Sequence, residues 1–320
     1  MSFVSWATIV DEFLMNPLPG NDDELFARLF QLRLKRDIQN LLLLRRRLAR
    51  GSQPSDARQR LHASLERLFA KDPTPPEALL TVPLFQYHLQ RATQVILEGG
   101  ETAPGRRLET IEVQEHTIKA FAEWLECNWI DSAQLASSSL KKAYVVINGH
   151  LLPVVASNQE LEDALAFISG KSGDEQLIPA AALANSVDII QAALQAIERV
   201  WPSLDREIVR WVRLIVPLAP APNPLRSFTL RRWMVGAIFF TTPEADPLFV
   251  QESIVHEATH TILDSFQVLD PLVDDKEHTT YEMPWSGNRR TMEELLHGTY
   301  VYVMLGFYFM AMKDNVDASE

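Results

Sequence analysis

Residues 235–266 read VGAIFFTTPEADPLFVQESIVHEATHTILDSF, and this stretch predicts a β-strand followed closely by a long helix. The run Val235–Thr242 is apolar, β-branched and aromatic, as is typical of a buried strand. Asp246 and Pro247 then form a helix start, with a capping carboxylate before a proline at the first helical position. Apolar residues continue at helical spacing as far as Phe266. We therefore expect a strand and a helix that pack together.

The predicted helix contains the motif HExxH, as His256-Glu257-Ala258-Thr259-His260. His256 and His260 are one turn apart on the same helix face, so both imidazoles can reach one cation. In a zinc hydrolase with this motif, Glu257 would be the general base. A strand just before such a helix is typical of a zincin core, where an edge strand beside the cleft pairs with an extended peptide. The pattern predicts a metal site.

A third ligand must come from elsewhere in the chain. The metzincin pattern is excluded, because Leu263 and Phe266 stand where that class has glycine and histidine. The remaining acidic and histidine candidates are Asp264, His278, Glu293, Glu294 and His297. Asp264 is equally explained as an exposed helix carboxylate, and His278 as a surface histidine in a polar loop. A glutamate ligand would indicate a zinc peptidase, whereas His297 would give a three-histidine site that suits iron as well as zinc.

The rest of the chain predicts a mostly helical protein of the α+β class. Periodic apolar residues indicate helices throughout residues 23–98 and again at Thr117–Trp129, Ser186–Val200 and Leu204–Leu214. Asn148-Gly149 lies between two apolar runs and predicts a type I′ hairpin. We expect helices around a small sheet, with the HExxH helix and a C-terminal helix completing the metal site. The expected organisation is a helical N-terminal region, 1–105, and a metal-binding catalytic region, 106–320.

Composition limits the classes of partner. The formal net charge of −12 argues against nucleic acid. A single cysteine excludes a disulfide framework, and the first residues lack the basic segment of a secretory signal, so we expect a cytoplasmic protein. The apolar stretch Leu295–Met312 has nearly the length of a membrane span. Because it carries His297 and follows a capping-box pattern at Thr291–Glu294, we expect a buried core helix and no membrane partner.

The sequence around the histidines resembles the HExxH-motif family of peptide-modifying proteins encoded near ribosomally synthesised peptides. The resemblance rests on the HExxH helix followed by Pro284-Trp285, an arginine, and Leu295-Leu-His-Gly298 leading into an aromatic-rich helix. It is specific over about residues 205–310 and generic before them. One departure is Asn288-Arg-Arg-Thr-Met292, which keeps an arginine seven residues before His297 but has no proline beside it.

This resemblance implies an iron(II)- and 2-oxoglutarate-dependent oxygenase that uses dioxygen to hydroxylate Cβ of a residue in a precursor peptide. It implies His256, His260 and His297 as metal ligands, and Arg290 as the group that binds the far carboxylate of 2-oxoglutarate, with Arg289 as the alternative. In such an oxygenase Glu257 would act as a hydrogen-bond acceptor behind the metal. Two other functions remain open: a zinc metallopeptidase with Glu257 as general base, and a peptide-binding protein whose metal is structural.

Overall fold

The computed structural model describes residues 23–50, 55–71, 82–97, 111–129, 142–157, 159–169, 177–219, 227–230, 233–243, 246–267, 272–273, 279–283 and 287–317. The N-terminal helices are α2 (Asp23–Ala49), α3 (Asp56–Lys71), α5 (Pro83–Leu97) and α6 (Ile111–Trp129). The later helices are α7 (Gln159–Ser169), α8 (Leu183–Val200), α9 (Pro202–Trp211), α10 (Pro247–Gln267) and α11 (Met292–Asp317), and a short 3-10 turn, Ala180–Ala182, precedes α8. The strands are β1 (Lys142–Ile147), β2 (His150–Val155), β3 (Leu214–Leu218), β4 (Ser227–Thr229), β5 (Ala237–Thr241), β6 (Thr280–Glu282) and β7 (Arg289–Thr291).

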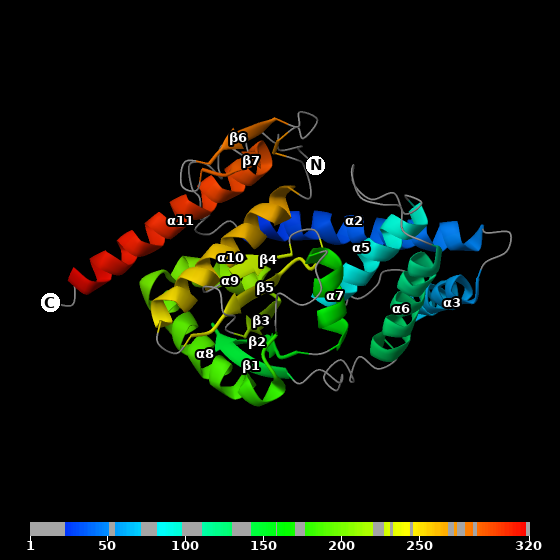
Figure 1. Cartoon of the computed structure of the whole chain (residues 1–320), viewed down its shortest axis with the longest axis horizontal. Helices are drawn as coiled ribbons and strands as arrows, with labels where there is room; N and C mark the ends of the chain where they lie inside the picture. Colours follow the sequence, from blue (N-terminus) through cyan, green and yellow to red (C-terminus); the bar gives the residue numbers. More distant parts are fainter. Residues whose placement is uncertain are drawn as a thin grey trace.

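The architecture is a mostly helical α+β fold around one mixed sheet, as the sequence predicts. Five strands form this sheet in the order β1-β2-β3-β5-β4, and β6 and β7 form a separate hairpin. The sheet lies between the N-terminal helices on one side and α8, α9 and α10 on the other (Figure 1). The coarse class is therefore confirmed.

The predicted hairpin is confirmed in detail. β1 pairs antiparallel with β2, and Ile147 lies opposite His150 across the two-residue turn. Asn148 and Gly149 both have positive φ, 49° and 75°, as a type I′ turn requires. The outer edge of β1 is partly closed by α8, because the Gln191 side chain accepts from the backbone N–H of Val146 at 2.7 Å and donates to its carbonyl at 2.8 Å.

The strand before the HExxH helix forms, but the expectation that it is an edge strand is wrong. β5 is hydrogen-bonded on both sides, parallel to β3 and antiparallel to the three-residue β4. The strand β3 was not expected, because the helix predicted to reach Leu214 ends at Trp211. The apolar run of β3 fits a helix as well as a strand, and its Pro217 argues against an interior strand.

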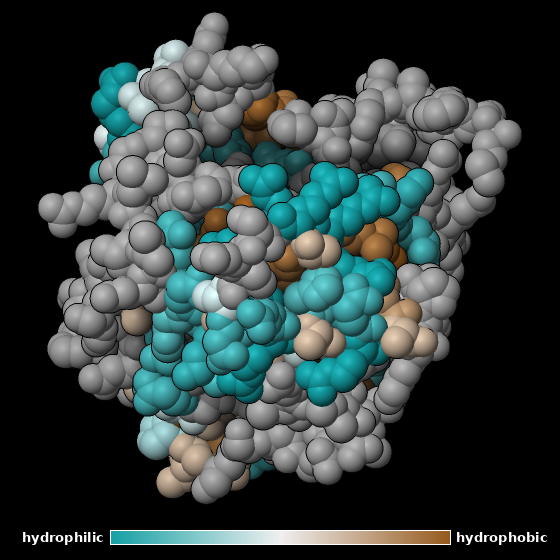
Figure 2. Space-filling view, turned by 90° about the vertical axis from the view of Figure 1, so that its right-hand side faces the viewer, coloured by the Kyte–Doolittle hydropathy of each residue, from teal (hydrophilic) through white to brown (hydrophobic). Residues whose placement is uncertain are grey.

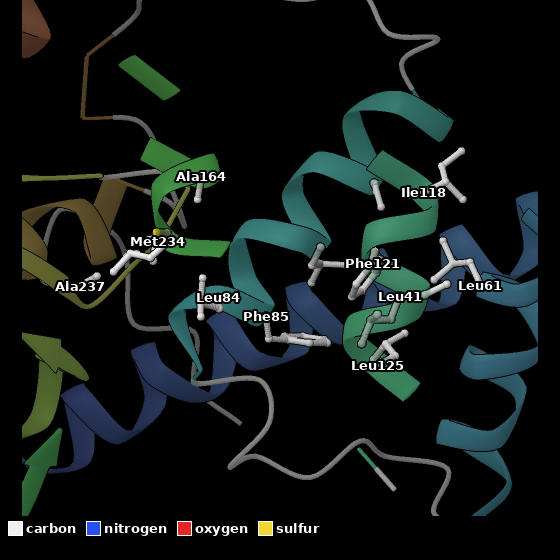
Figure 3. Packing of buried hydrophobic residues seen from close by; sticks show 14 of the residues in the cluster. Leu41, Leu61, Leu84, Phe85, Ile118, Phe121, Leu125, Ala164, Met234 and Ala237 are labelled. Atoms are coloured by element: carbon white, nitrogen blue, oxygen red, sulfur yellow. The ribbon is translucent and has the colours of Figure 1, made fainter. Parts of the chain in front are cut away.

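Alternate residues of the central strands pack into two separate hydrophobic clusters. Phe239 is fully buried in the cluster that includes the N-terminal helices, and Phe240 is fully buried in the cluster that includes α8, α9 and α10. Figure 3 shows the first cluster running from Leu41 and Phe121 in the helical bundle to Ala237 at the sheet. The bundle therefore shares its core with the sheet, while its outer face is mostly hydrophilic where described residues reach the surface (Figure 2).

The predicted boundary after residue 105 precedes α6, which packs against α3 and α5. The division into two regions stays a prediction.

The C-terminal helix matches the prediction of a buried core helix on one face only. Val301, Met304, Leu305 and Tyr308 of α11 are buried, whereas the opposite side exposes large apolar residues: Tyr302, Val303, Phe307, Phe309 and Met310. Within the described residues, Ala180–Val200 and Met292–Asn315 are long and apolar enough to cross a membrane. This criterion uses only the length and composition of a helix, and core helices of soluble proteins satisfy it too.

Candidate metal centre

The helix α10 presents the HExxH histidines as its sequence predicts. Its first turn is capped by Asp246, whose Oδ1 accepts the backbone N–H of Phe249 at 3.0 Å. The rings of His256 and His260 have centroids 4.9 Å apart and planes inclined by 62°. Both histidines are half-buried, although most of the surrounding helix is fully buried. The two imidazoles therefore share one helix face that is partly open to solvent.

The helix α11 brings His297 against this pair, from 37 positions further along the chain. The Nδ1 atoms of His260 and His297 are 3.1 Å apart, and the two rings lie stacked with centroids 5.4 Å apart. The side chain of His297 is fully buried at the crossing of α10 and α11. The structure thus brings His297 to His260, while His256 lies one turn earlier on the same helix.

Two further side chains of α10 hold the imidazole of His297. Its Nε2 lies 2.5 Å from Oε1 of Gln267 and 3.4 Å from Oδ1 of Asp264. Both oxygens are acceptors, so a proton on Nε2 is favoured and the lone pair is left on Nδ1, which faces His260. The arrangement fixes the tautomer that a metal ligand needs.

The sequence analysis missed Gln267 and took Asp264 as a possible ligand or an exposed residue. Asp264 is in fact buried, with 5% of its surface exposed. Their spacing could have indicated this role, because Asp264 and Gln267 are four and seven residues after His260 and so lie on the same helix face as that histidine.

The nitrogen positions of His260 and His297 fit joint coordination of one ion. Two ligands at metal–nitrogen distances of about 2.1 Å stand roughly 3.0 Å apart at a right angle and roughly 3.4 Å apart at a tetrahedral angle. The observed 3.1 Å falls within this interval. Among the residues that the structure describes, however, no group of three or more His, Cys, Asp or Glu side chains is arranged as a complete ligand set. The pair fits a metal, and the role of His256 as the remaining ligand stays a prediction.

Glu257 is buried beside His256, which is partly buried. Glu257 is 1% exposed, and its Oε1 lies 3.8 Å from Nε2 of His256. Burial lowers the pKa of His256 to about 4, because desolvation penalises the imidazolium. His256 is therefore neutral near pH 7, the form that can donate a lone pair to a metal.

Glu294, in the first turn of α11, forms hydrogen bonds with neighbouring residues of its own helix start. Glu294 forms the predicted capping box: its Oε2 accepts the backbone N–H of Thr291 at 2.9 Å, and its own N–H donates to the Thr291 hydroxyl at 3.3 Å. Its Oε1 accepts from Arg290 at 3.0 Å. The position of Glu294 is thus fixed by helix capping and by an ion pair.

The predicted 2-oxoglutarate residues lie on the β6–β7 hairpin. The Arg290 side chain is 51% exposed and is paired with Glu294. Arg289 reaches across the hairpin and donates to the carbonyl of Thr280 at 2.7 Å and to its hydroxyl at 3.0 Å. Among the other residues discussed from sequence, His278 and Trp285 lie outside the described part of the chain.

An open cavity of about 780 Å³ lies where α8, α9 and the β1–β2 turn meet. Its lining is rich in arginine: Asn148, His150, Glu198, Arg199, Pro202, Arg206, Val209, Arg210 and Arg213. None of these is a predicted site residue, so this cavity is separate from His256, His260 and His297.

Neither the protein-family models nor the curated proteins gave a match to this chain.

Proposed function

We propose that this protein is an iron(II)- and 2-oxoglutarate-dependent oxygenase that hydroxylates Cβ of a residue in a ribosomally synthesised precursor peptide, as a member of the HExxH-motif family that its sequence resembles. The observation that supports the proposal is the contact between His260 of α10 and His297 of α11, whose Nδ1 atoms are 3.1 Å apart, with His256 one turn before His260. A three-histidine set leaves further metal positions open for a chelating keto acid and dioxygen.

The roles of the residues follow from their contacts. His256, His260 and His297 would hold the iron, and Asp264 and Gln267 would fix the ring of His297 through Nε2. When bound, the iron supplies an oxidation in which dioxygen and 2-oxoglutarate convert a C–H bond to C–OH and yield succinate and carbon dioxide. Glu257, buried beside His256, would act as a hydrogen-bond acceptor behind the metal.

The surroundings of Glu294 weigh against a peptidase with a glutamate ligand. Both of its carboxylate oxygens already accept hydrogen bonds, from Thr291 and Arg290. Ligation by Glu294 would break the helix cap, at a cost of about 1 kcal/mol, as well as the ion pair.

A zinc metallopeptidase is the second candidate, and the position of Glu257 favours it. A carboxylate 3.8 Å from a predicted ligand histidine would lie near a metal bound by that histidine, where a general base would activate water. In that mechanism the removal of the base costs several orders of magnitude in rate.

The deciding experiment compares wild type and Glu257→Gln after anaerobic loading with either iron(II) or zinc. For the oxygenase we expect the iron-loaded wild type to convert 2-oxoglutarate to succinate, and Glu257→Gln to retain measurable conversion. The amide keeps an acceptor oxygen in place but cannot act as a base. Peptide cleavage by the zinc-loaded wild type, without any conversion of 2-oxoglutarate by the iron-loaded protein, would replace this proposal with the peptidase.

A further inference from the structure

The open cavity between α8, α9 and the β1–β2 turn is positively charged, although the chain as a whole is acidic. Among the described residues that line it, Glu198 is the one carboxylate, and four are arginines: Arg199, Arg206, Arg210 and Arg213. The chain has a formal net charge of −12. The net charge repels an approaching anion, whereas the arginines of this cavity attract it.

Three of the arginines follow one another along α9. Arg206 and Arg210 are four residues apart in the helix, and Arg213 comes three residues later, just beyond its C-terminal end. The helix dipole favours Arg210 in the last turn, but like charges four residues apart destabilise a helix. At a rise of 1.5 Å per residue the row spans roughly 10 Å. Carboxylates on alternate residues of an extended peptide stand about 6.5 Å apart, so two of them fit along this row.

Contacts behind the cavity hold two of these arginines in place. Nη1 of Arg210 donates to Oε1 of Glu207 at 2.9 Å, and the buried Glu207 also accepts from Nε1 of Trp211 at 3.0 Å. The backbone N–H of Arg213 donates to the carbonyl of Gly236 at 2.8 Å, and its Cγ lies 3.0 Å from the position that a Cβ on Gly236 would take. Side chains held in this way lose less conformational entropy when a ligand binds.

Two carboxylates act against the positive charge of the cavity. Glu198 is exposed, whereas Asp205 is fully buried and accepts through Oδ2 from the side chain of Asn148. Burial is the main cause that raises the pKa of Asp205 to about 7, while Glu198 adds to the rise and Arg206 opposes it. Near pH 7 Asp205 is therefore partly neutral, and the cavity keeps an excess of positive charge.

We propose that this cavity binds an acidic segment of the peptide substrate, away from the residue that is hydroxylated. This inference rests on the proposed function, which supplies a peptide as the substrate. Guanidinium groups bind carboxylates through charge-assisted hydrogen bonds, and arginine clusters recognise acidic motifs in this way. Apart from Pro202 and Val209 the lining is polar or charged, whereas sites for drug-sized molecules are mostly apolar. Charge is thus the main means of recognition that the cavity offers.

The test measures binding of two synthetic peptides to the full-length protein by fluorescence anisotropy, without 2-oxoglutarate so that no turnover occurs. One peptide alternates glutamate with glycine, and the matched neutral peptide has glutamine in place of each glutamate. We expect only the acidic peptide to bind, and added salt to weaken it, because exposed charges are screened. Arg206→Gln combined with Arg213→Gln should weaken binding about 10-fold or more, as expected when charge-assisted hydrogen bonds are lost.

Two single substitutions are the matched controls. Glu198→Gln removes a negative charge from the lining and should tighten binding of the acidic peptide, by up to about 5-fold. A variant with a damaged fold would not show this gain. Arg60→Gln removes an arginine of α3 that is paired with Glu123 outside the cavity, and it should bind as the wild type does. Circular dichroism establishes that each variant is folded.

The outcomes separate this inference from the proposed function. Equal binding of the acidic peptide by wild type and the double variant overturns the inference, and so does equal binding of the acidic and neutral peptides. Absence of acidic-peptide binding also overturns it, and binding of inorganic pyrophosphate in its place would make the cavity a site for small phosphates. Each of these results leaves the oxygenase intact. Absence of 2-oxoglutarate conversion by the iron-loaded wild type overturns the proposed function, and with it the identity of the bound peptide as substrate.

Discussion

The helices α10 and α11 are both long and apolar, yet the protein buries them differently. α10 is packed against the sheet, α8 and α11, and most of its residues from Val250 to Phe266 are buried. α11 covers one side of α10 and then continues outward toward the C-terminus (Figure 1), leaving Phe307 and Met310 exposed. Apolar composition thus does not determine burial, which depends on the neighbours that tertiary folding supplies. The predicted ligands His260 and His297 meet where the two helices cross.

The largest effect is expected from removing the histidine that α11 contributes. His297→Ala should abolish iron binding as thoroughly as His256→Ala, because each removes one of three predicted nitrogen ligands. Glu293→Ala and Glu294→Ala should bind iron normally. Iron content after anaerobic loading of the purified variants tests this. Full occupancy in His297→Ala would mean that α11 supplies a glutamate ligand instead.

The second prediction compares one phenylalanine from each helix. Phe266 on α10 is 3% exposed, and Phe307 on α11 is 43% exposed. Phe266→Ala should lower the free energy of unfolding by about 3–5 kcal/mol, because it removes buried surface and leaves a cavity. Phe307→Ala should change it by no more than about 0.5 kcal/mol. Urea unfolding of the metal-free proteins measures both values. A large cost for Phe307→Ala would mean that the outer face of α11 is covered in solution.

The third prediction concerns the hydrogen bond by which α10 orients His297 on α11. Gln267→Ala should weaken metal affinity about 10- to 100-fold, the usual cost of losing such a support. Gln251→Ala is the matched control, since it removes an amide of the same helix that accepts from Tyr308 at 2.7 Å. It should leave metal affinity unchanged. Competition with a chelator of known affinity gives both values, and an equal loss in the two variants would contradict a specific role for Gln267.

The smallest effect is expected at the exposed start of α11. Arg290→Ala removes a solvent-exposed ion pair with Glu294, which is worth about 0–1 kcal/mol in the free energy of unfolding. Iron content should not change. Thermal unfolding and the apparent Michaelis constant for 2-oxoglutarate are the measurements. A rise of that constant by about 10- to 150-fold would support Arg290 as the carboxylate-binding residue that the sequence predicts, and an unchanged constant would contradict that role.

Several parts of the molecule could be predicted because a few neighbouring residues encode them. Asn148-Gly149 determines its turn through positive φ angles, and Thr291 with Glu294 determines the start of α11 through a capping box. The 3.6-residue period places His256 and His260 on one face of α10. These features need no information from distant parts of the chain.

What the tertiary structure decided is the set of partners across long sequence separations. Packing of α11 on α10 brings His297 to His260, and it converts Asp264 and Gln267 from ordinary helix residues into supports for that ring. Likewise, pairing with β3 and β4 makes β5 an interior strand. The sequence by itself determined local geometry, since that depends on backbone preferences and spacing. Burial and the contact between His260 and His297 depended on how apolar faces pack together, which no single segment specifies.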